Sequence, residues 1–167
     1  MNREHIYYTI IGAGLLLVVA IVVWQVWPES TEPLDPPAVL SQKLETAPPA
    51  QKVKAAQDFV RHGAAARTEV RAALEQHQRY EPEVVAPLLQ ATMKNRDYRS
   101  MPTLIELLEH EDPLVRGRAG AAVQKILGAD FGYRANAPDE ERRRIIEVIK
   151  SDYQQSVGRF STVYGNQ

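Results

Sequence analysis

The sequence predicts an all-α protein: a short α-solenoid of antiparallel helix pairs, preceded by an N-terminal transmembrane helix. Three observations support this fold class. Residues 6–27 form an apolar run without a charge. From about residue 50 onward, apolar residues recur at helical spacing and no run alternates with period two. Part of this helical region also repeats itself along the chain.

Composition narrows the possible functions. The chain has 20 Lys plus Arg against 21 Asp plus Glu and a net charge of -1, which gives no general reason to expect a nucleic-acid partner. Cysteine is absent, so there is no disulfide framework, thiolate metal site or cysteine nucleophile. The length of 167 residues suits one domain of ordinary size.

The apolar run at residues 6–27 predicts a membrane anchor. As a helix it would be about 33 Å long at about 1.5 Å per residue, enough to cross a hydrocarbon core of about 30 Å. Tyr7 and Tyr8 lie at one end and Trp24 and Trp27 at the other, where aromatic rings prefer the headgroup layer. A cleaved signal peptide would have a shorter apolar core followed by small residues. We therefore expect an uncleaved, single-pass anchor.

The residues that flank the anchor predict its orientation. Arg3 precedes the anchor, whereas acidic residues follow it before the next basic residue, Lys43. Because basic residues stay on the cytoplasmic side, we expect residues 1–5 to be cytoplasmic. The C-terminal domain would then lie outside the cell (inner) membrane, in the periplasm of a bacterium.

Residues 28–49 read as a proline-rich linker. Proline fixes φ and removes a backbone donor, so this segment cannot be one continuous helix. A short helix at about 38–45 is compatible with the pattern, and the rest would act as a semi-stiff spacer. The segment holds six of the eleven prolines: Pro28, Pro33, Pro36, Pro37, Pro48 and Pro49.

Residues 50–155 are expected to form the helical repeat domain. The clearest helix covers residues 113–127, with Asp112 placed to cap it and Pro113 at its first position, where the missing N–H is harmless. An amphipathic segment at 101–111 precedes it after only a few residues, so the two helices must pack antiparallel. The apolar stripes are Met101, Leu104, Ile105, Leu107 and Leu108 in the first helix and Val115, Ala119, Ala122, Val123 and Ile126 in the second.

A shift of 31 residues reveals the repeat, because Glu81–Val84 then falls on Asp112–Val115. A second shift gives a degenerate first copy, in which Gln57 falls where Leu88 should. A helical hairpin of this length cannot bury its own stripe, and stacking of neighbouring copies closes the core.

The segment PTLIELLEHEDPLVRGRAGAAVQKILG, residues 102–128, resembles the HEAT-repeat family, in particular the short HEAT-like repeats named for phycobilisome lyases. The match lies in the Leu-rich first helix that Pro102 opens, the turn at 112–116 and the small-residue second helix. It covers about residues 67–127. The resemblance implies a binding scaffold more than a reaction. It also implies a ladder between neighbouring repeats and structural roles for the repeat-turn residues Asp112, Pro113, Val115 and Arg116.

The stretch GADFGYRANAPDEERRR at residues 128–144 contains the triplet Asp-Phe-Gly, the metal-binding signature of protein kinases. A kinase also needs a glycine-rich loop, a strand lysine and a catalytic loop, none of which occurs in this sequence. The stretch instead predicts a structural link. Gly128 can end the preceding helix in a left-handed conformation, and Phe131 and Tyr133 would pack over the open end of the stack.

A closing helix is expected to begin at Pro138, where acidic residues meet the positive end of the helix. Arg142, Arg143 and Arg144 would form its polar side, and residues 156–167 would be a polar C-terminal tail. The buried face is expected to carry Ile145, Ile149, Tyr153 and Val157.

No pattern for catalysis or metal binding accompanies the helices. We therefore expect no enzyme activity, no cofactor and no metal. The four histidines lie near predicted helix ends, where we expect them to be solvated: His5, His62, His77 and His110.

These features predict a non-enzymatic, membrane-tethered scaffold or adaptor that binds a protein partner at the membrane surface. Two alternatives stay open: an accessory subunit assembled through its transmembrane helix, and a lyase-type or ligand-handling enzyme. The candidate contact face lies beside the second helix of each pair, at Lys94, Arg96, Arg99, Arg116 and Arg118.

Overall fold

A computed structural model describes residues 33–164, with side chains as far as Val157. The predicted anchor at 6–27 lies outside the described residues. The described chain is helical, with no strand in residues 33–164, and it belongs to a compact unit that begins at Leu34. Within the same range, no helix combines the length and the apolar character needed to cross a membrane.

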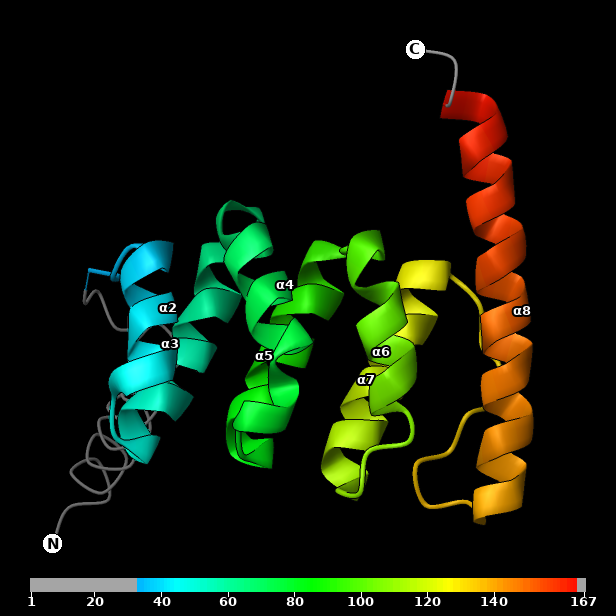
Figure 1. Ribbon diagram of the computed structural model, residues 1–167, viewed down its shortest axis with the longest axis horizontal. Coiled ribbons are helices and arrows are strands. Elements are labelled where there is room, and N and C mark those ends of the chain that lie inside the picture. The colour runs from blue at the N-terminus through cyan, green and yellow to red at the C-terminus, as the bar shows by residue number, and fades with distance from the viewer. Residues whose placement is uncertain (1–32, 165–167) are drawn as a thin grey trace, which may run out of the picture. The chain divides into compact units, whose positions relative to one another are not determined.

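Three helical pairs follow one another through residues 33–127, and a long helix closes the domain (Figure 1). The first helices of the pairs are α2 (Pro37–Thr46), α4 (Arg67–Glu75) and α6 (Met101–Leu107). The second helices are α3 (Pro49–His62), α5 (Pro82–Asn95) and α7 (Pro113–Leu127). The closing helix is α8 (Asp139–Tyr164). Short 3₁₀ turns lie at η1 (Gly63–Ala66), η2 (His77–Arg79) and η3 (Tyr98–Ser100).

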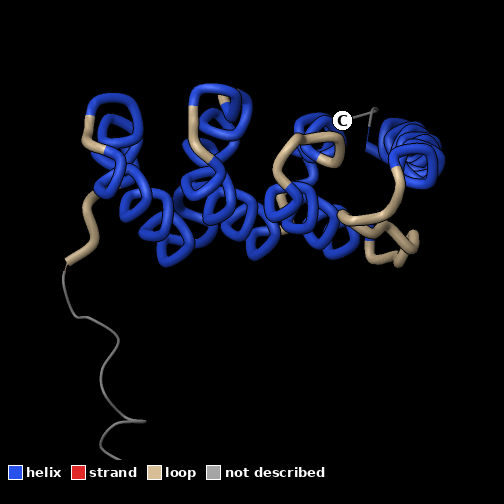
Figure 2. The backbone as a smooth tube through the Cα atoms, turned by 90° about the horizontal axis from the view of Figure 1, so that it is seen from below, coloured by secondary structure: helices blue, strands red, loops and turns tan. Residues whose placement is uncertain are grey.

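The helices form two rows, which Figure 2 shows nearly end-on. The second helices contact one another in sequence, α3 with α5 and α5 with α7, and α8 contacts α6. The turns inside the pairs, at residues 46–49, 75–82 and 107–113, lie along one edge, which we call the within-pair edge (Figure 1). The turns at 62–67 and 95–101 lie along the opposite edge, the between-pair edge.

Helix α7 has the bounds that the sequence predicts. The Asp112 side chain accepts hydrogen bonds from the backbone N–H groups of Leu114 at 2.7 Å and Val115 at 3.2 Å. These bonds satisfy donors that the first turn of a helix leaves unpaired. Gly128 ends the helix with φ of 74°, a left-handed conformation that glycine adopts without steric strain. Proline occupies the first position of α7 as predicted.

Helix α2 belongs to the folded domain, so the predicted linker at 28–49 was too long. Leu40 and Leu44 are 0% and 1% exposed and join the same core as Phe59 of α3. The prolines at each end of α2 misled the prediction. Pro37 and Pro49 begin helices α2 and α3, where proline is favourable, and do not interrupt them.

Helix α8 departs from the prediction in its buried face. Ile149 is buried as predicted, but Ile146 is buried as well, and Val157 is 41% exposed. Figure 1 shows that the upper part of α8 rises beyond the ends of the other helices. The ring of Tyr153 lies 5.4 Å from that of Tyr98 and fixes α8 to the turn before α6. The helix continues to Tyr164, so the boundary predicted at residue 156 falls inside it.

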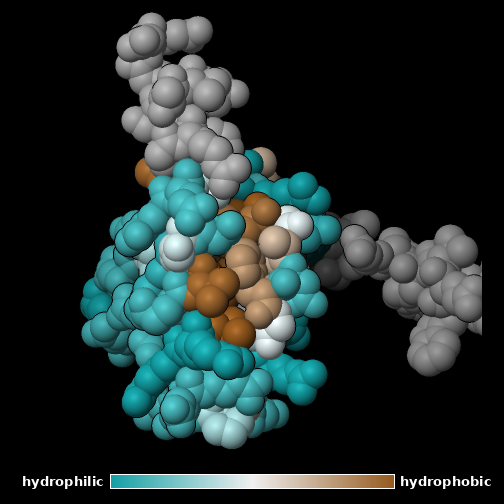
Figure 3. All heavy atoms as spheres, turned by 90° about the vertical axis from the view of Figure 1, so that its right-hand side faces the viewer, coloured by the Kyte–Doolittle hydropathy of each residue, from teal (hydrophilic) through white to brown (hydrophobic). Residues whose placement is uncertain are grey.

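The outer side of the domain at α8 keeps some apolar surface. Figure 3 shows hydrophobic residues in the middle of this face, with hydrophilic residues around them. On α8 itself, Val148 is 50% exposed and Ile145 is only partly buried, so both contribute apolar surface.

The link from α7 to α8 packs against the core through Phe131 and Tyr133, as predicted. The Tyr133 hydroxyl donates a hydrogen bond to the carbonyl oxygen of Leu108 at 2.5 Å. The Asp130 carboxylate accepts hydrogen bonds from the side chain of Gln124 and from the backbone N–H of Gly132. The Asp-Phe-Gly triplet thus holds the link against the end of α7.

Gly120 should tolerate no side chain, whereas nearby Gly117 should. A Cβ atom at Gly120 would lie 2.7 Å from Cδ1 of Tyr133, but one at Gly117 would lie 3.7 Å from its nearest neighbour. We expect Gly120→Ala to lower the free energy of unfolding by about 1–3 kcal/mol. Gly117→Ala should leave it unchanged or raise it by up to about 1 kcal/mol, because alanine favours the helix. Chemical denaturation in detergent would compare them, and equal effects would contradict the packing of Tyr133.

Removal of the Tyr133 hydroxyl should weaken the domain in a pH-dependent way. Burial raises the pKa of Tyr133 above 10.0, more than the guanidinium groups of Arg142 and Arg116 lower it. The folded chain therefore keeps this proton to a higher pH than the unfolded chain, and stability falls as the pH rises through the folded-state pKa. Tyr133→Phe should lower the free energy of unfolding by about 1 kcal/mol near neutral pH. The difference in stability between this variant and the parent should shrink above about pH 10. A constant deficit in denaturation curves across this range would contradict the assignment.

Candidate interaction surfaces

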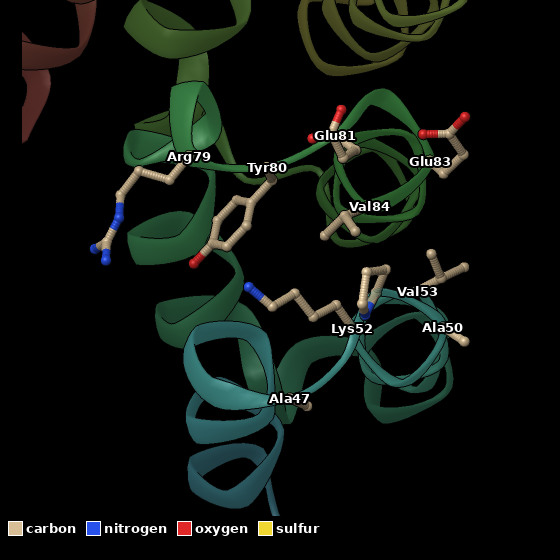
Figure 4. Close-up of a pocket in the computed structure, with 10 residues that line it drawn as sticks. Ala47, Ala50, Lys52, Val53, Arg79, Tyr80, Glu81, Glu83 and Val84 are labelled. Atoms are coloured by element: carbon tan, nitrogen blue, oxygen red, sulfur yellow. The ribbon is translucent and has the colours of Figure 1, made fainter.

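A pocket of about 340 Å³ opens at the within-pair edge, between the first and second helical pairs (Figure 4). Its apolar lining comes from the α2–α3 turn and from Val53 of α3 and Val84 of α5. Figure 4 shows the side chains of Lys52 and Tyr80 pointing toward each other at one side of this space. The pocket therefore combines an apolar floor with a polar side. Its lining residues are Ala47, Pro49, Ala50, Lys52, Val53, Arg79, Tyr80, Glu81, Glu83 and Val84.

The rim of this pocket carries both signs of charge. Lys52 and Arg79 contribute positive charge, and Glu81 and Glu83 contribute negative charge. Burial raises the pKa of Tyr80, and the Coulombic effect of Arg79 lowers it. The Tyr80 hydroxyl is therefore neutral at physiological pH and is a hydrogen-bonding group, not an anion.

A second depression, the between-pair groove, has a volume of about 540 Å³ and lies at the between-pair edge. Four arginines and one aspartate line it, a formal charge of +3. The aspartate, Asp97, is buried; it lies 3.7 Å from Arg71 and accepts a hydrogen bond from the Ser100 hydroxyl at 3.0 Å. The other three arginines are exposed. The groove is lined by Ala64, Arg67, Thr68, Arg71, Arg96, Asp97, Tyr98 and Arg99.

The structure brings together two of the five residues predicted as a contact face. Arg96 and Arg99 line the between-pair groove, where they meet Arg67 and Arg71, which the sequence did not single out. No local pattern links these four, because α4 and the α5–α6 turn meet only through tertiary packing.

The other three predicted contact residues lie elsewhere. Lys94 is exposed near the C-terminal end of α5, where its amino group donates to the carbonyl oxygen of Val60 at 3.2 Å. Arg116 and Arg118 lie in the N-terminal half of α7, and only Arg118 is exposed. The five residues therefore share no single site.

Arg116 holds the chain around α7 together. Its guanidinium donates to the carbonyl oxygens of His110 at 2.8 Å, Glu111 at 2.7 Å and Ala135 at 2.9 Å. It thereby joins the α6–α7 turn to the link that follows α7. Asp112 caps its own helix, so the ladder implied by the HEAT resemblance is not formed by these two side chains.

His77 is buried, so the expectation that the histidines are solvated was wrong at this position. Its Nδ1 lies 3.0 Å from the carbonyl oxygen of Leu74, and its Nε2 lies 3.7 Å from the Glu106 carboxylate. Its ring meets that of His110 edge-on across the second and third pairs. Among the residues that the structure describes, no group of three or more potential ligands is arranged to hold a metal ion.

Arg142 also departs from its predicted place on the polar side of α8. Its guanidinium donates to the carbonyl oxygen of Ala137 at 2.7 Å and pairs with Asp139 at 2.9 Å, while Arg143 and Arg144 are exposed. Arg142 therefore anchors the start of α8.

Charge separates between the two edges of the domain. The second helices run in the same direction, with their N-terminal ends at the within-pair edge and their C-terminal ends at the between-pair edge. Acidic groups are favourable near helix N-termini and basic groups near C-termini. Exposed acids gather at the within-pair edge, namely Glu45, Glu75, Glu81, Glu83, Glu106, Glu109 and Glu111. Most exposed bases of the helical pairs gather at the between-pair edge, namely Arg61, Arg67, Lys94, Arg96, Arg99 and Lys125, although Arg79 is exposed at the within-pair edge.

Comparison of the chain with protein-family models, with curated proteins and with solved structures finds no match. The resemblance to HEAT repeats therefore rests on the residues quoted above.

Arg116 should matter for stability and Arg118 should not. Arg116→Met removes hydrogen bonds to three carbonyl oxygens, and bonds to a charged group contribute about 1.5–3 kcal/mol each, so we expect a loss of at least that size. Arg118→Met changes an exposed side chain and should stay within about 0.5 kcal/mol of the parent. Thermal unfolding of both variants in detergent would check this, and an unaffected Arg116→Met would reassign Arg116 to the contact face.

Proposed function

We propose that the chain is a membrane-tethered, HEAT-like repeat scaffold that binds a protein partner. Three consecutive pairs support the solenoid assignment, because each second helix contacts the second helix of the next pair. The uncharged run at residues 6–27 supports the tether. Such a tether raises the effective concentration of the domain for partners in or near the same membrane.

The pocket at the within-pair edge is the observation that carries this proposal. It lies between two successive pairs, so the stacking of repeats creates it. Its volume of about 340 Å³ falls at the small end of the range of ligand sites, about 300–1,000 Å³. A pocket of this size accommodates one large apolar side chain of a partner.

The surroundings of the pocket suit a polypeptide. The apolar floor at Val53 and Val84 would contact an anchoring side chain, and Tyr80 offers a hydroxyl for a hydrogen bond. Charges of both signs at the rim can pair with polar groups on either side of that anchor. Binding sites between proteins have this organisation, in which a central anchor contributes most of the energy and a polar rim surrounds it.

Partner capture in intact cells tests the proposal. We would place a photo-crosslinking residue at Glu81, on the pocket rim, and compare the parent with Ala50→Trp and Ala72→Trp. Ala50 is exposed and lines the pocket, whereas Ala72 is exposed on α4 outside it. The tryptophan at position 50 should occupy the pocket and weaken binding by about 2 kcal/mol or more, a typical loss at an interface hot spot.

The expected result is one protein that is linked from position 81 in the parent and in Ala72→Trp, and lost in Ala50→Trp. A linked protein that persists in Ala50→Trp would place the partner elsewhere on the domain. The absence of any linked protein would contradict partner binding at this edge.

A further inference from the structure

We infer that the between-pair groove binds the headgroups of anionic phospholipids in the membrane that holds the anchor. This inference rests on the proposed membrane tether, but on different residues from the partner pocket. The groove contacts the lipid phosphates mainly through Arg67, Arg96 and Arg99.

The first support is the local excess of positive charge. The chain as a whole has a net charge of -1, yet the groove has a formal charge of +3. Its one carboxylate, on Asp97, is only 7% exposed and lies 3.7 Å from Arg71. The exposed arginines are therefore not neutralised within the groove. Guanidinium groups match phosphate oxygens in both charge and geometry.

The conformation of the α5–α6 turn presents these arginines outward. Arg96 ends α5 in the left-handed region, with φ of 47°, and it alone does so among the non-glycine residues of the described chain. Its exposed side chain follows α5 immediately, and that of Arg99 comes from the next turn, η3. On the facing side, Arg67 begins α4 and donates to the carbonyl oxygen of Asn95 at 3.3 Å, which holds the two sides of the groove together.

The second support is the place at which the chain enters the domain. The carbonyl oxygen of Asp35 lies 2.8 Å from Nε2 of His62, at the C-terminal end of α3. The Asp35 carboxylate also pairs with Lys43 of α2. Asp35, where the chain enters the domain, is thus fixed at the between-pair edge. This is the same edge that carries the groove.

The length of chain between the predicted anchor and Asp35 allows this edge to reach lipid. The predicted anchor ends at residue 27, so residues 28–34 are all that separate it from the fixed Asp35. Even fully extended, these residues span at most about 25 Å. Basic residues near an anionic membrane surface are attracted to it, and the attraction decays within a Debye length of about 8–10 Å. The within-pair edge is acidic, so an anionic membrane surface would repel it. Attraction at one edge and repulsion at the other both favour an orientation in which the between-pair edge faces the membrane.

The experiment uses the full chain in lipid nanodiscs. Because the chain lacks cysteine, a Thr68→Cys variant would carry one environment-sensitive fluorophore at the groove. A Gln78→Cys variant would carry it at the opposite edge. We would compare nanodiscs of phosphatidylcholine alone with nanodiscs that also contain phosphatidylglycerol.

We expect phosphatidylglycerol to shift the emission at position 68 to shorter wavelength, to leave position 78 unchanged, and to lose its effect in high salt. Each exposed arginine should raise the equilibrium constant for contact between the groove and anionic lipid roughly fivefold. The shift should therefore be lost in Arg67→Gln/Arg96→Gln/Arg99→Gln. The matched control Arg118→Gln/Arg143→Gln/Arg144→Gln removes the same charge from exposed sites outside the groove and should keep it.

Four results would overturn the inference. Equal emission in both lipids, or equal loss in the two triple variants, would show that the groove does not select anionic lipid. The same shift produced by inorganic phosphate in phosphatidylcholine nanodiscs would assign the groove to a free anion. A shift in native membranes but not in phosphatidylglycerol would assign it to an acidic protein.

Failure of the tether is measured separately. Extraction of the full chain from cell membranes by alkaline carbonate would contradict the anchor, and this inference with it. A chain that resists carbonate but shows no dependence on phosphatidylglycerol would contradict the lipid contact and leave the anchor in place.

Discussion

The stacking of the second helices α3, α5 and α7 is the contact on which the rest of the structure depends. Small residues make the close approach possible, since Ala56, Ala91 and Ala122 are fully buried in the shared core. One pair alone would leave its apolar stripe in water, so each pair is stable only against its neighbours. The last stripe needs a cover, which α8 and the link at residues 128–138 provide. Tyr133 binds this link to the end of α6, and Arg116 binds it to the start of α7.

The same stacking determines the electrostatics. Because the second helices run parallel, their N-termini and C-termini are collected at opposite edges, whereas the dipoles of the first helices α2, α4 and α6 point the other way. Acidic side chains near the N-terminus of a second helix, such as Glu81 and Glu83, and basic side chains near its C-terminus, such as Lys94, are favourable in this arrangement. Like charges on one edge repel, and the domain relieves part of this through the contact between Arg71 and the buried Asp97.

The sequence predicted α7 to the residue because every local signal agreed there. The cap at Asp112, the proline at the first position, the apolar stripe and Gly128 all point to one helix. Helix α2 was assigned to a linker because dense prolines obscured a short amphipathic segment. In both cases the information was local, and the error at α2 lay in how the prolines were weighed.

The two surfaces could not be predicted in the same way, because they join residues that are distant in the sequence. The pocket needs the α2–α3 turn beside the α4–α5 turn, and the groove needs Arg67 beside Arg96. The burial of His77 likewise depends on the neighbouring pair. These neighbours are set by the register in which helices stack, and a stripe of apolar residues does not encode that register. The sequence therefore indicated that a basic face exists. The prediction included Arg116 in that face, but the guanidinium of Arg116 donates hydrogen bonds inside the fold.

The length of the second helices separates the two surfaces. At about 1.5 Å per residue, α5 with its 14 residues is about 21 Å long, and the pocket and the groove lie toward its opposite ends. This separation exceeds the Debye length of about 8 Å at physiological ionic strength, so a charged ligand at one edge barely changes the potential at the other. A domain that rests on lipid through its between-pair edge would hold the pocket beyond the headgroups, facing the aqueous phase. The acidic residues around the pocket would then keep that edge away from the anionic surface. Tethering and partner binding can therefore act on one small domain without competing for the same residues.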